Sequence, residues 1–383
     1  MAKPRSIFEE VEGERSASPQ GGMIDKAPKG ARGAIRIWLA VMFVMVFAII
    51  LVGGATRLTD SGLSITEWRP VAGALPPLTE ADWQVEFDKY RQSPQYEHLN
   101  KGMELSSFKF IFWWEWGHRQ LARVLGLVWG LGFLYFWATK RIPTGWTKRL
   151  LLIGGPGALQ GAVGWWMVSS GLVGTMTTVA SYRLATHLGL AFVIFGFLGW
   201  YVFLLGRTEA DLMQARRSRE AKLFSMSTGL MHFAFLQIIL GALVAGIDAG
   251  RAFPTWPDMN GEFFPSNGFY VPEGGAVWRA FFENEGLVQF MHRMAGYLLA
   301  IFAFVVWRRS RKSPHQETRK AFDLIALMMV GQVALGIAAV LTAAHLHTAL
   351  THQAGAVILW VLILRGRYLA QYPIAGSIRK GTA

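Results

Sequence analysis

The segment from Trp113 to Gly126 places ionisable side chains inside a stretch that is otherwise suited to lipid. It carries a carboxylate, an imidazole and two guanidinium groups, at Glu115, His118, Arg119 and Arg123. Charged groups are costly inside a bilayer, so such residues usually mark a functional site. Glu115 precedes His118 by three residues, which puts both side chains on one face of a helix. The pattern predicts proton or charge chemistry beside an imidazole.

Four of the nine histidines occupy similar places in apolar segments that run in the same direction. They are His118, His187, His292 and His352. Each lies one or two turns after the start of its segment, about 6–11 Å below the outer end at the helical rise per residue. Two neutral imidazoles on facing helices can bind both axial positions of a haem iron. The spacing predicts two iron sites, one in each half of the chain.

Two other readings of these histidines are open. A membrane histidine can simply form an interhelical hydrogen bond. A zinc or copper centre is a second alternative, but carboxylate, Met or Cys ligands do not recur beside the histidines in both halves. The chain has no cysteine at all, which excludes disulfides, thiolate metal sites and covalent c-type haem attachment.

The elements that must position these residues are membrane helices. The chain has 383 residues, 52% of them hydrophobic and 16% charged. Eight apolar blocks have the roughly 20 residues that a helix needs to cross a bilayer. They lie near 35–57, 111–138, 149–170, 183–206, 224–247, 286–307, 320–343 and 346–366. The formal charge of +13 is spread over short linkers and not over a basic domain, which argues against nucleic acid as a partner.

Most Lys and Arg residues fall in the two tails and in alternate linkers. By the positive-inside rule, both termini face the cytoplasm. We therefore expect an all-α polytopic membrane protein with eight transmembrane helices and long outer loops near 58–110 and 248–285. The expected parts are a flexible cytoplasmic tail (1–34), a four-helix bundle (35–206), a cytoplasmic linker (207–223), a second four-helix bundle (224–366) and a cytoplasmic tail (367–383).

The two bundles read as tandem repeats. DSGLSITEW (60–68) and DAGRAFPTW (248–256) share Asp, Gly and Trp at the same offsets. Gln160-xxx-Gly164 matches Gln332-xxx-Gly336, and a Thr precedes both His187 and His352. Glu115 has Gln289 as its counterpart, and an amide cannot transfer protons at ordinary pH. The N-terminal bundle is therefore expected to carry out chemistry, and the C-terminal bundle to hold a structural or electron-transferring haem.

Four arginines are candidates for contacts to haem propionates. Arg119 and Arg293 directly follow candidate ligands, and a guanidinium suits bidentate carboxylate contacts. Arg123 lies one turn deeper, and Arg57 ends the first span. Snorkelling to the interface is the alternative for Arg119 and Arg293, and it fits the deeper Arg123 less well. For Arg57 the alternative is that it anchors the end of the helix. For Glu115 the alternative to catalysis is an ion pair with Arg119 or Arg123.

Taken together, these segments resemble the haem A synthases. The resemblance rests on GGATRLTDSGLSITEWRPVAGALPP, EWGHRQLARVLG, THLGLA, GRAFPTWPDMNG, FMHRMAGY and LTHQAG, and it runs in order from about residue 35 to 366. The cysteine-free loops are similar to those of the alphaproteobacterial and mitochondrial branch. Other bacterial members carry a cysteine pair in an outer loop, so a thiol-based step does not carry over to this chain.

The resemblance implies an oxidoreductase of the cell inner membrane that serves cytochrome oxidase assembly. Its substrate would be haem O, one methyl group of which is oxidised by successive hydroxylation to the formyl group of haem A. It implies a haem b on His292 and His352, with His118 and His187 around the substrate haem and Glu115 required for activity. Expected partners are haem O synthase, an electron acceptor, membrane lipid and a second copy of the chain.

Two rival functions use the same residues. A di-haem electron-transfer protein of the quinol-linked cytochrome b type would carry haem B in both sites and perform no chemistry on haem. A transporter with repeated halves would use Glu115 as a proton carrier and would be colourless.

Overall fold

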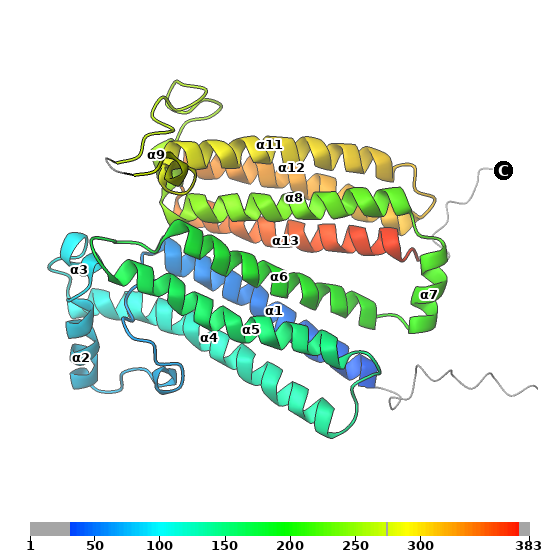
Figure 1. Cartoon of the computed structure of the whole chain (residues 1–383), viewed down its shortest axis with the longest axis horizontal. Helices are drawn as coiled ribbons and strands as arrows, with labels where there is room; N and C mark the ends of the chain where they lie inside the picture. The colour runs from blue at the N-terminus through cyan, green and yellow to red at the C-terminus, as the bar shows by residue number, and fades with distance from the viewer. Residues whose placement is uncertain (1–30, 273–274, 375–383) are drawn as a thin grey trace, which may run out of the picture.

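The computed structural model describes residues 31–272 and 275–374, and every regular element of that part of the chain is a helix. Eight long helices run side by side (Figure 1). They are α1 (Ala31–Leu58), α4 (Leu105–Ala138), α5 (Thr147–Val168), α6 (Ser181–Leu205), α8 (Ala221–Gly246), α11 (Glu285–Ser310), α12 (Gln316–Leu341) and α13 (Leu346–Gln371). Of the expected tails (1–34 and 367–383), residues 1–30 and 375–383 lie outside the described part of the chain.

Seven of these helices are long and apolar enough to cross a membrane, within the residues described. The exception is α5, whose apolar content is diluted by several glycines, by Pro156 and by Gln160. Most helix ends lie within a few residues of the predicted block. The largest difference is α4, which begins at Leu105 and not near 111.

The extra turns of α4 belong to a small core outside the main bundle. Phe108 and Phe112 pack there against Trp83 and Phe87 of α2 (Glu80–Tyr90). Because α4 starts early, His118 lies nearly four turns from its N-terminus, but about two turns after the start of the predicted apolar block near 111. The other three candidate ligands lie about two turns into their helices, as predicted.

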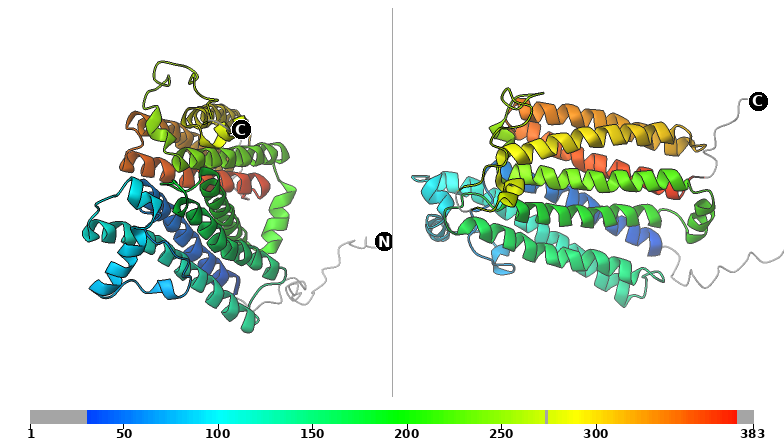
Figure 2. Two further views of the ribbon diagram at one scale, coloured as in Figure 1. Left: turned by 60° about the vertical axis from the view of Figure 1, so that its left-hand side comes forward. Right: turned by 45° about the horizontal axis from the view of Figure 1, so that its top comes forward.

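Short elements lie at the two ends of the bundle. At one end are α2, α3 (Pro94–His98), α9 (Ala249–Ala252), α10 (Ala280–Glu283) and the single turns η2 (Ala72–Ala74), η3 (Ser169–Leu172) and η4 (Val277–Arg279). At the other end, α7 (Glu209–Arg217) connects α6 to α8 (Figures 1 and 2). Both α2 and α7 begin with a capping box, in which a Thr and an Asp three residues later satisfy each other's backbone N–H groups.

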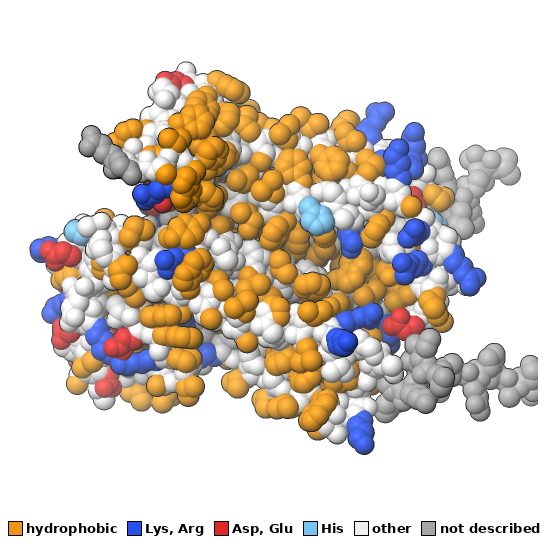
Figure 3. Space-filling model, in the orientation of Figure 1, with side chains coloured by type: hydrophobic (Ala, Val, Ile, Leu, Met, Phe, Trp, Pro, Cys, Tyr) orange, Lys and Arg blue, Asp and Glu red, His pale blue; other side chains and the backbone are white. Residues whose placement is uncertain are grey.

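The surface is divided as a membrane protein requires. Apolar side chains cover much of the flank in Figure 3, and Lys and Arg gather near the α7 end. Strongly exposed apolar residues line the outer faces of α4, α11 and α12: Leu127, Leu131, Leu134, Leu298, Ile301, Leu327 and Val330. An apolar surface this extensive is stable only in contact with lipid or another protein.

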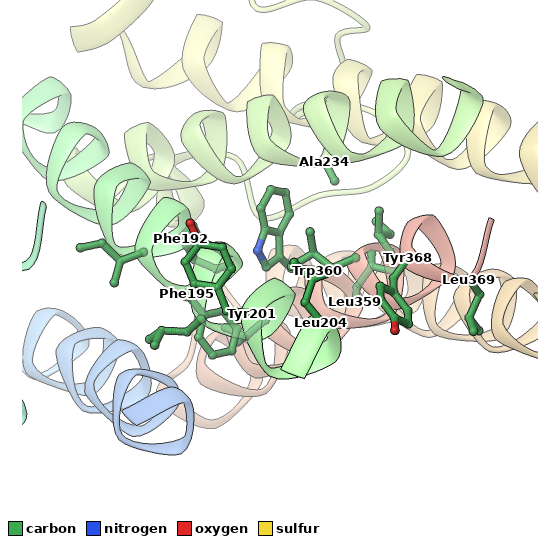
Figure 4. Close-up of a cluster of buried hydrophobic side chains, with 14 of the residues drawn as sticks. Phe192, Phe195, Tyr201, Leu204, Ala234, Leu359, Trp360, Tyr368 and Leu369 are labelled. Carbon is green, nitrogen blue, oxygen red and sulfur yellow. The ribbon is translucent and has the colours of Figure 1, made fainter. Parts of the chain in front are cut away.

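The two halves meet along α6 and α13, where large aromatic side chains interlock. Phe192 of α6 meets Trp360 of α13 edge to face, with ring centroids 6.0 Å apart (Figure 4). Trp360 also lies near Phe235 of α8. Edge-to-face aromatic pairs add to the stabilisation from burial alone. This core fixes the distance between helices that carry candidate ligands.

Close helix packing in the N-terminal half depends on glycine. A Cβ added at Gly154 of α5 would lie 2.0 Å from the Trp129 ring of α4, whereas one added at Gly155 would meet nothing within 4 Å. We expect Gly154→Ala to lower the free energy of unfolding by about 1–3 kcal/mol, because overpacking forces the helices apart. Gly155→Ala is the matched control. Thermal unfolding followed by circular dichroism checks this, and equal midpoints for the two variants would contradict the packing described.

Candidate functional site

The C-terminal histidine pair is arranged to hold one metal ion. The rings of His292 on α11 and His352 on α13 have centroids 6.5 Å apart and planes at 87°. A metal–nitrogen distance of about 2.1 Å on each side, with roughly 1 Å from each nitrogen to its ring centre, gives about 6 Å. The pair therefore fits a six-coordinate iron gripped from two faces, as in a bis-histidine haem.

Each ring of this pair rests on a neighbouring helix through a glutamine and a glycine. Gln237 of α8 donates from Nε2 to the His292 carbonyl oxygen at 2.9 Å, and Gln332 of α12 does the same to His352 at 2.8 Å. One turn after each glutamine, a Cβ added at Gly241 or Gly336 would come within 3.0–3.1 Å of the ring. Only glycine leaves these rings room.

The N-terminal histidines are held differently. Gln160 of α5 donates to the His187 carbonyl oxygen at 2.9 Å, and Gly164 lies against that ring. His118 faces Gly53 of α1, where an added Cβ would lie 2.9 Å from its Nε2. Within the described chain, no ring contact like that of the C-terminal pair joins His118 to His187. The structure thus places all four histidines on long helices of the bundle, and it gives a ring separation of 6.5 Å for His292 and His352.

Sequence reasoning singled out Gln160 and Gln332 as repeat partners and missed Gln237, Gly241 and Gly53. The missed signal was present as QIILG at 237–241, which has the same spacing as the other two motifs. It was overlooked because the matching segment of the first helix has Ile49 where the others have glutamine.

Glu115 is almost fully buried, with 3% exposure, and its carboxylate accepts three hydrogen bonds. Ser64 donates its hydroxyl at 2.7 Å and Ile65 its backbone N–H at 2.8 Å. Arg119 donates to the other oxygen at 2.5 Å. The ion pair between Glu115 and Arg119, which is the alternative to a catalytic role, is therefore present. No ion pair between Glu115 and Arg123 forms among the described residues.

Gln289 occupies the same kind of place in the other half. Its Nε2 donates to the Ala249 carbonyl oxygen at 2.8 Å, and its Oε1 accepts from Arg293 at 3.0 Å. Both residues thus bind the segment that connects the preceding long helix to their own helix. We call this connection the outer segment of each half. Glu115 does so as an acceptor from that segment, whereas Gln289 does so as a donor to it.

The candidate arginines mainly bind outer-segment backbone. Arg119 donates to the Ile65 carbonyl oxygen at 3.0 Å, and Arg123 donates to that of Pro70 at 2.9 Å. Arg293 is only 7% exposed and donates to the carbonyl oxygens of Phe253 and Asp258, both at 2.8 Å. These arginines hold the outer segments over the histidine-bearing ends of the helices.

Arg57 joins the two halves of the chain. Its guanidinium pairs with Asp248 at 2.6 Å and with Asp60 at 3.2 Å. Both aspartates begin the repeated Asp-x-Gly motif, and both adopt positive φ angles of 52° and 55°. Burial raises the pKa of Asp60, and the nearby positive charge of Arg57 works in the opposite direction. Through these ion pairs, Arg57 connects the end of α1 to the segment that follows α8.

Two cavities open beneath the outer segments, one beside each arginine that follows a candidate ligand. The N-terminal cavity has a volume of about 370 Å³ and is lined by Trp116, Arg119 and Arg123, with Arg69 and Lys89 at its edge. The C-terminal one has about 320 Å³ and is lined by Arg293, Tyr297 and Trp256. The N-terminal cavity is also lined by Glu67, Asp82 and Glu86, and Glu67 and Glu86 pair with Arg69 and Lys89.

Comparisons with known proteins agree with this architecture. A family model described as "Cytochrome oxidase assembly protein" matches residues 36–364. A protein of Ruegeria sp. (strain TM1040) named "Heme A synthase" is 62% identical over 98% of this chain and 99% of its own length. Proteins of the same name from Paracoccus denitrificans (strain Pd 1222) and Cereibacter sphaeroides (strain ATCC 17029 / ATH 2.4.9) are 61% and 59% identical, over 98–99% of both chains. The chain therefore belongs to the cytochrome oxidase assembly protein family that includes the haem A synthases.

Proposed function

We propose that this protein is a haem A synthase, which oxidises one methyl group of haem O to the formyl group of haem A. The observation that carries the proposal is the end-to-end similarity to relatives named "Heme A synthase". In balanced form, the methyl group and one water molecule give the formyl group, four protons and four electrons. The electrons pass to an external acceptor, and the oxygen atom comes from water.

The C-terminal half is proposed to hold haem b between His292 and His352. The 6.5 Å ring separation supports this assignment. A haem b bound there would accept and pass on single electrons. Gln237 and Gln332 orient the two imidazoles from the neighbouring helices α8 and α12.

The N-terminal half is proposed to bind haem O between His118 and His187. Glu115 supplies a buried negative charge near the reacting ring, which stabilises positive charge that develops as the substrate loses electrons. Its carboxylate is also the proposed acceptor of a proton from the attacking water. Arg119 holds Glu115 in place, and Arg123 lines the adjacent cavity, where a substrate propionate is proposed to lie.

The finer topology is part of the same proposal. The eight long helices are proposed to cross the cell inner membrane as two duplicated four-helix bundles, 35–206 and 224–366, with both termini cytoplasmic. The gathering of Lys and Arg at the α7 end supports that orientation. The matching contacts of Glu115 and Gln289, and of Gln160 and Gln332, support the duplication. Haem O synthase, an electron acceptor and a second copy of the chain are the proposed partners.

A difference between the two histidine pairs favours the synthase over the di-haem electron-transfer alternative. A protein with two resident haems would need two equally prepared ligand pairs. Here a glutamine amide lies at Nδ1 of both rings in the C-terminal pair, whereas in the N-terminal pair His118 has no hydrogen bond to its ring within the described residues. A site that binds and releases a substrate accounts for the second arrangement.

The proposal is tested by expressing the chain in a bacterium that makes haem O but no haem A. Extracted haem is then separated and identified by mass. Haem A is expected in cells with the wild-type chain and not in cells with an empty vector. Haem O unchanged and haem A absent, with the protein present in the membrane, would refute the proposed activity.

A further inference from the structure

Three of the four membrane histidines rest on the same two-residue device, which we call the histidine seat. A seat consists of a glutamine and the glycine four residues later on a neighbouring helix. The seats are Gln160–Gly164 on α5, Gln237–Gly241 on α8 and Gln332–Gly336 on α12. In each, the glutamine amide donates to the main-chain carbonyl of the histidine at 2.8–2.9 Å. In each, a Cβ added at the glycine would lie 3.0–3.1 Å from the ring Cε1.

The glutamine of the seat is suited to a metal-bound imidazole. An imidazole that binds metal through Nε2 carries a hydrogen on Nδ1, and that hydrogen normally has an acceptor. The Nδ1 atoms of His292 and His352 both lie 3.1 Å from a glutamine amide nitrogen. The Oε1 atoms of all three seat glutamines are buried without a partner. Turning the amide over would bring this oxygen to Nδ1–H of His292 or His352, in exchange for the bond that the amide nitrogen donates to the histidine carbonyl.

His118 is the exception. It faces Gly53, but the residue one turn earlier on α1 is Ile49, which has no polar group to offer. No hydrogen bond to the His118 ring is present in the described part of the chain. Gly53 leaves space for the ring, and nothing polar fixes its orientation. Of the four candidate ligands, His118 alone has half a seat.

We propose that His118 is the exchangeable iron ligand of the N-terminal site, and that Ile49 in place of glutamine makes it so. This inference rests on the proposed function, because a substrate haem must enter and its product must leave while haem b stays. His187 has both seat residues, with Gln160 Nε2 at its main-chain carbonyl and 3.4 Å from its ring Nε2, and it then remains the fixed ligand. Loss of the outer partner of a metal-bound histidine typically weakens metal affinity 10–100-fold, which is the scale needed to separate a released product from a resident cofactor.

Completing the fourth seat tests this directly. Purified protein loaded with haem A is mixed with excess phosphatidylcholine vesicles, and haem transfer is followed by Soret absorbance. Ile49→Gln is expected to slow haem A release about 10–100-fold and to sharpen the low-spin electron paramagnetic resonance signal of the N-terminal site. Ile49→Leu is the matched control, because it keeps the site apolar. Its release rate is expected to equal that of the wild type.

The converse change removes a seat from the C-terminal site. A Cβ added at Gly355 would lie 2.2 Å from Gln332 Oε1, so Gly355→Ala displaces the glutamine without altering the histidine. Haem b is expected to dissociate about 10–100-fold faster from this variant. Gly331→Ala is the control, because Gly331 lies beside Gln332 on α12 and a Cβ added there would meet nothing within 4 Å. Gln332→Leu gives the same expected loss by a second route if the first variant is poorly produced.

The outcomes separate the seat from the proposed function. Unchanged haem A release from Ile49→Gln, with haem b loosened in Gly355→Ala, would overturn the assignment of His118 as the exchangeable ligand. Unchanged haem b release from both Gly355→Ala and Gln332→Leu would overturn the seat itself. Absence of haem O and haem A from the wild-type preparation would instead overturn the proposed function on which the exchange assignment rests.

Discussion

Replacing His352 with alanine is expected to remove haem b from the C-terminal half. The two rings of that site are 6.5 Å apart, and each is proposed to supply one of the two axial contacts, so a haem held from a single face would be weakly retained. The low-spin spectrum of the site should disappear, and extracted haem B should fall to background. Visible spectra of the purified variant, with mass-resolved haem extraction, measure both effects.

His232 provides the matched control for this variant. It is also a histidine of a long helix, α8, but its Nδ1 lies 2.9 Å from the Thr228 carbonyl oxygen of the same helix. His232→Ala is expected to retain haem b fully. A His352→Ala protein with normal haem B and an unaltered low-spin spectrum would show that the ligand pair is assigned wrongly.

Replacing Glu115 with alanine is expected to stop haem A production while substrate still binds. General acid–base catalysis contributes about 10²–10⁴-fold to rates, so haem A output should fall by at least about 100-fold and haem O should accumulate. Glu115→Gln should behave similarly, because the amide carries no charge. Haem A and haem O extracted from producing cells give the measurement.

Because Glu115 also fastens the outer segment, a second variant is needed. Ser64→Ala removes one of the three hydrogen bonds to the carboxylate and leaves its charge in place. If the charge is what matters, Ser64→Ala retains most of the activity that Glu115→Gln loses. Equal losses in both variants would show that Glu115 acts by holding the segment, and normal haem A output from Glu115→Gln would refute its catalytic role.

The long helices could be located from sequence because their signal is simple. A segment that spans lipid must be apolar over about 20 residues, and each predicted block overlaps one long helix. The start of α4 was misplaced for the same reason. Its first turns pack against α2 outside the apolar block, so that hydropathy alone does not reveal them. The capping boxes of α2 and α7 were readable signals that hydropathy does not use.

Some residues of the candidate site could be predicted from the sequence and others could not. The four histidines were found because helical spacing fixes their depth and facing. The partners of Glu115 were not, because Ser64 and Ile65 lie in an irregular segment whose path has no periodic signature. The seat on α8 was missed because repeat matching compares the first helix with the fifth, and Ile49 breaks the match with Gln237. The same residue, Ile49 in place of glutamine, also distinguishes His118 from the other three histidines.

The central claim is that one half keeps a haem b while the other handles haem O, and the haem content of the purified protein tests it most directly. The protein is extracted in mild detergent, its non-covalent haem is released, and each species is quantified by mass. We predict haem B together with haem O or haem A. Haem B alone at two per chain, or no haem at all, would contradict the account.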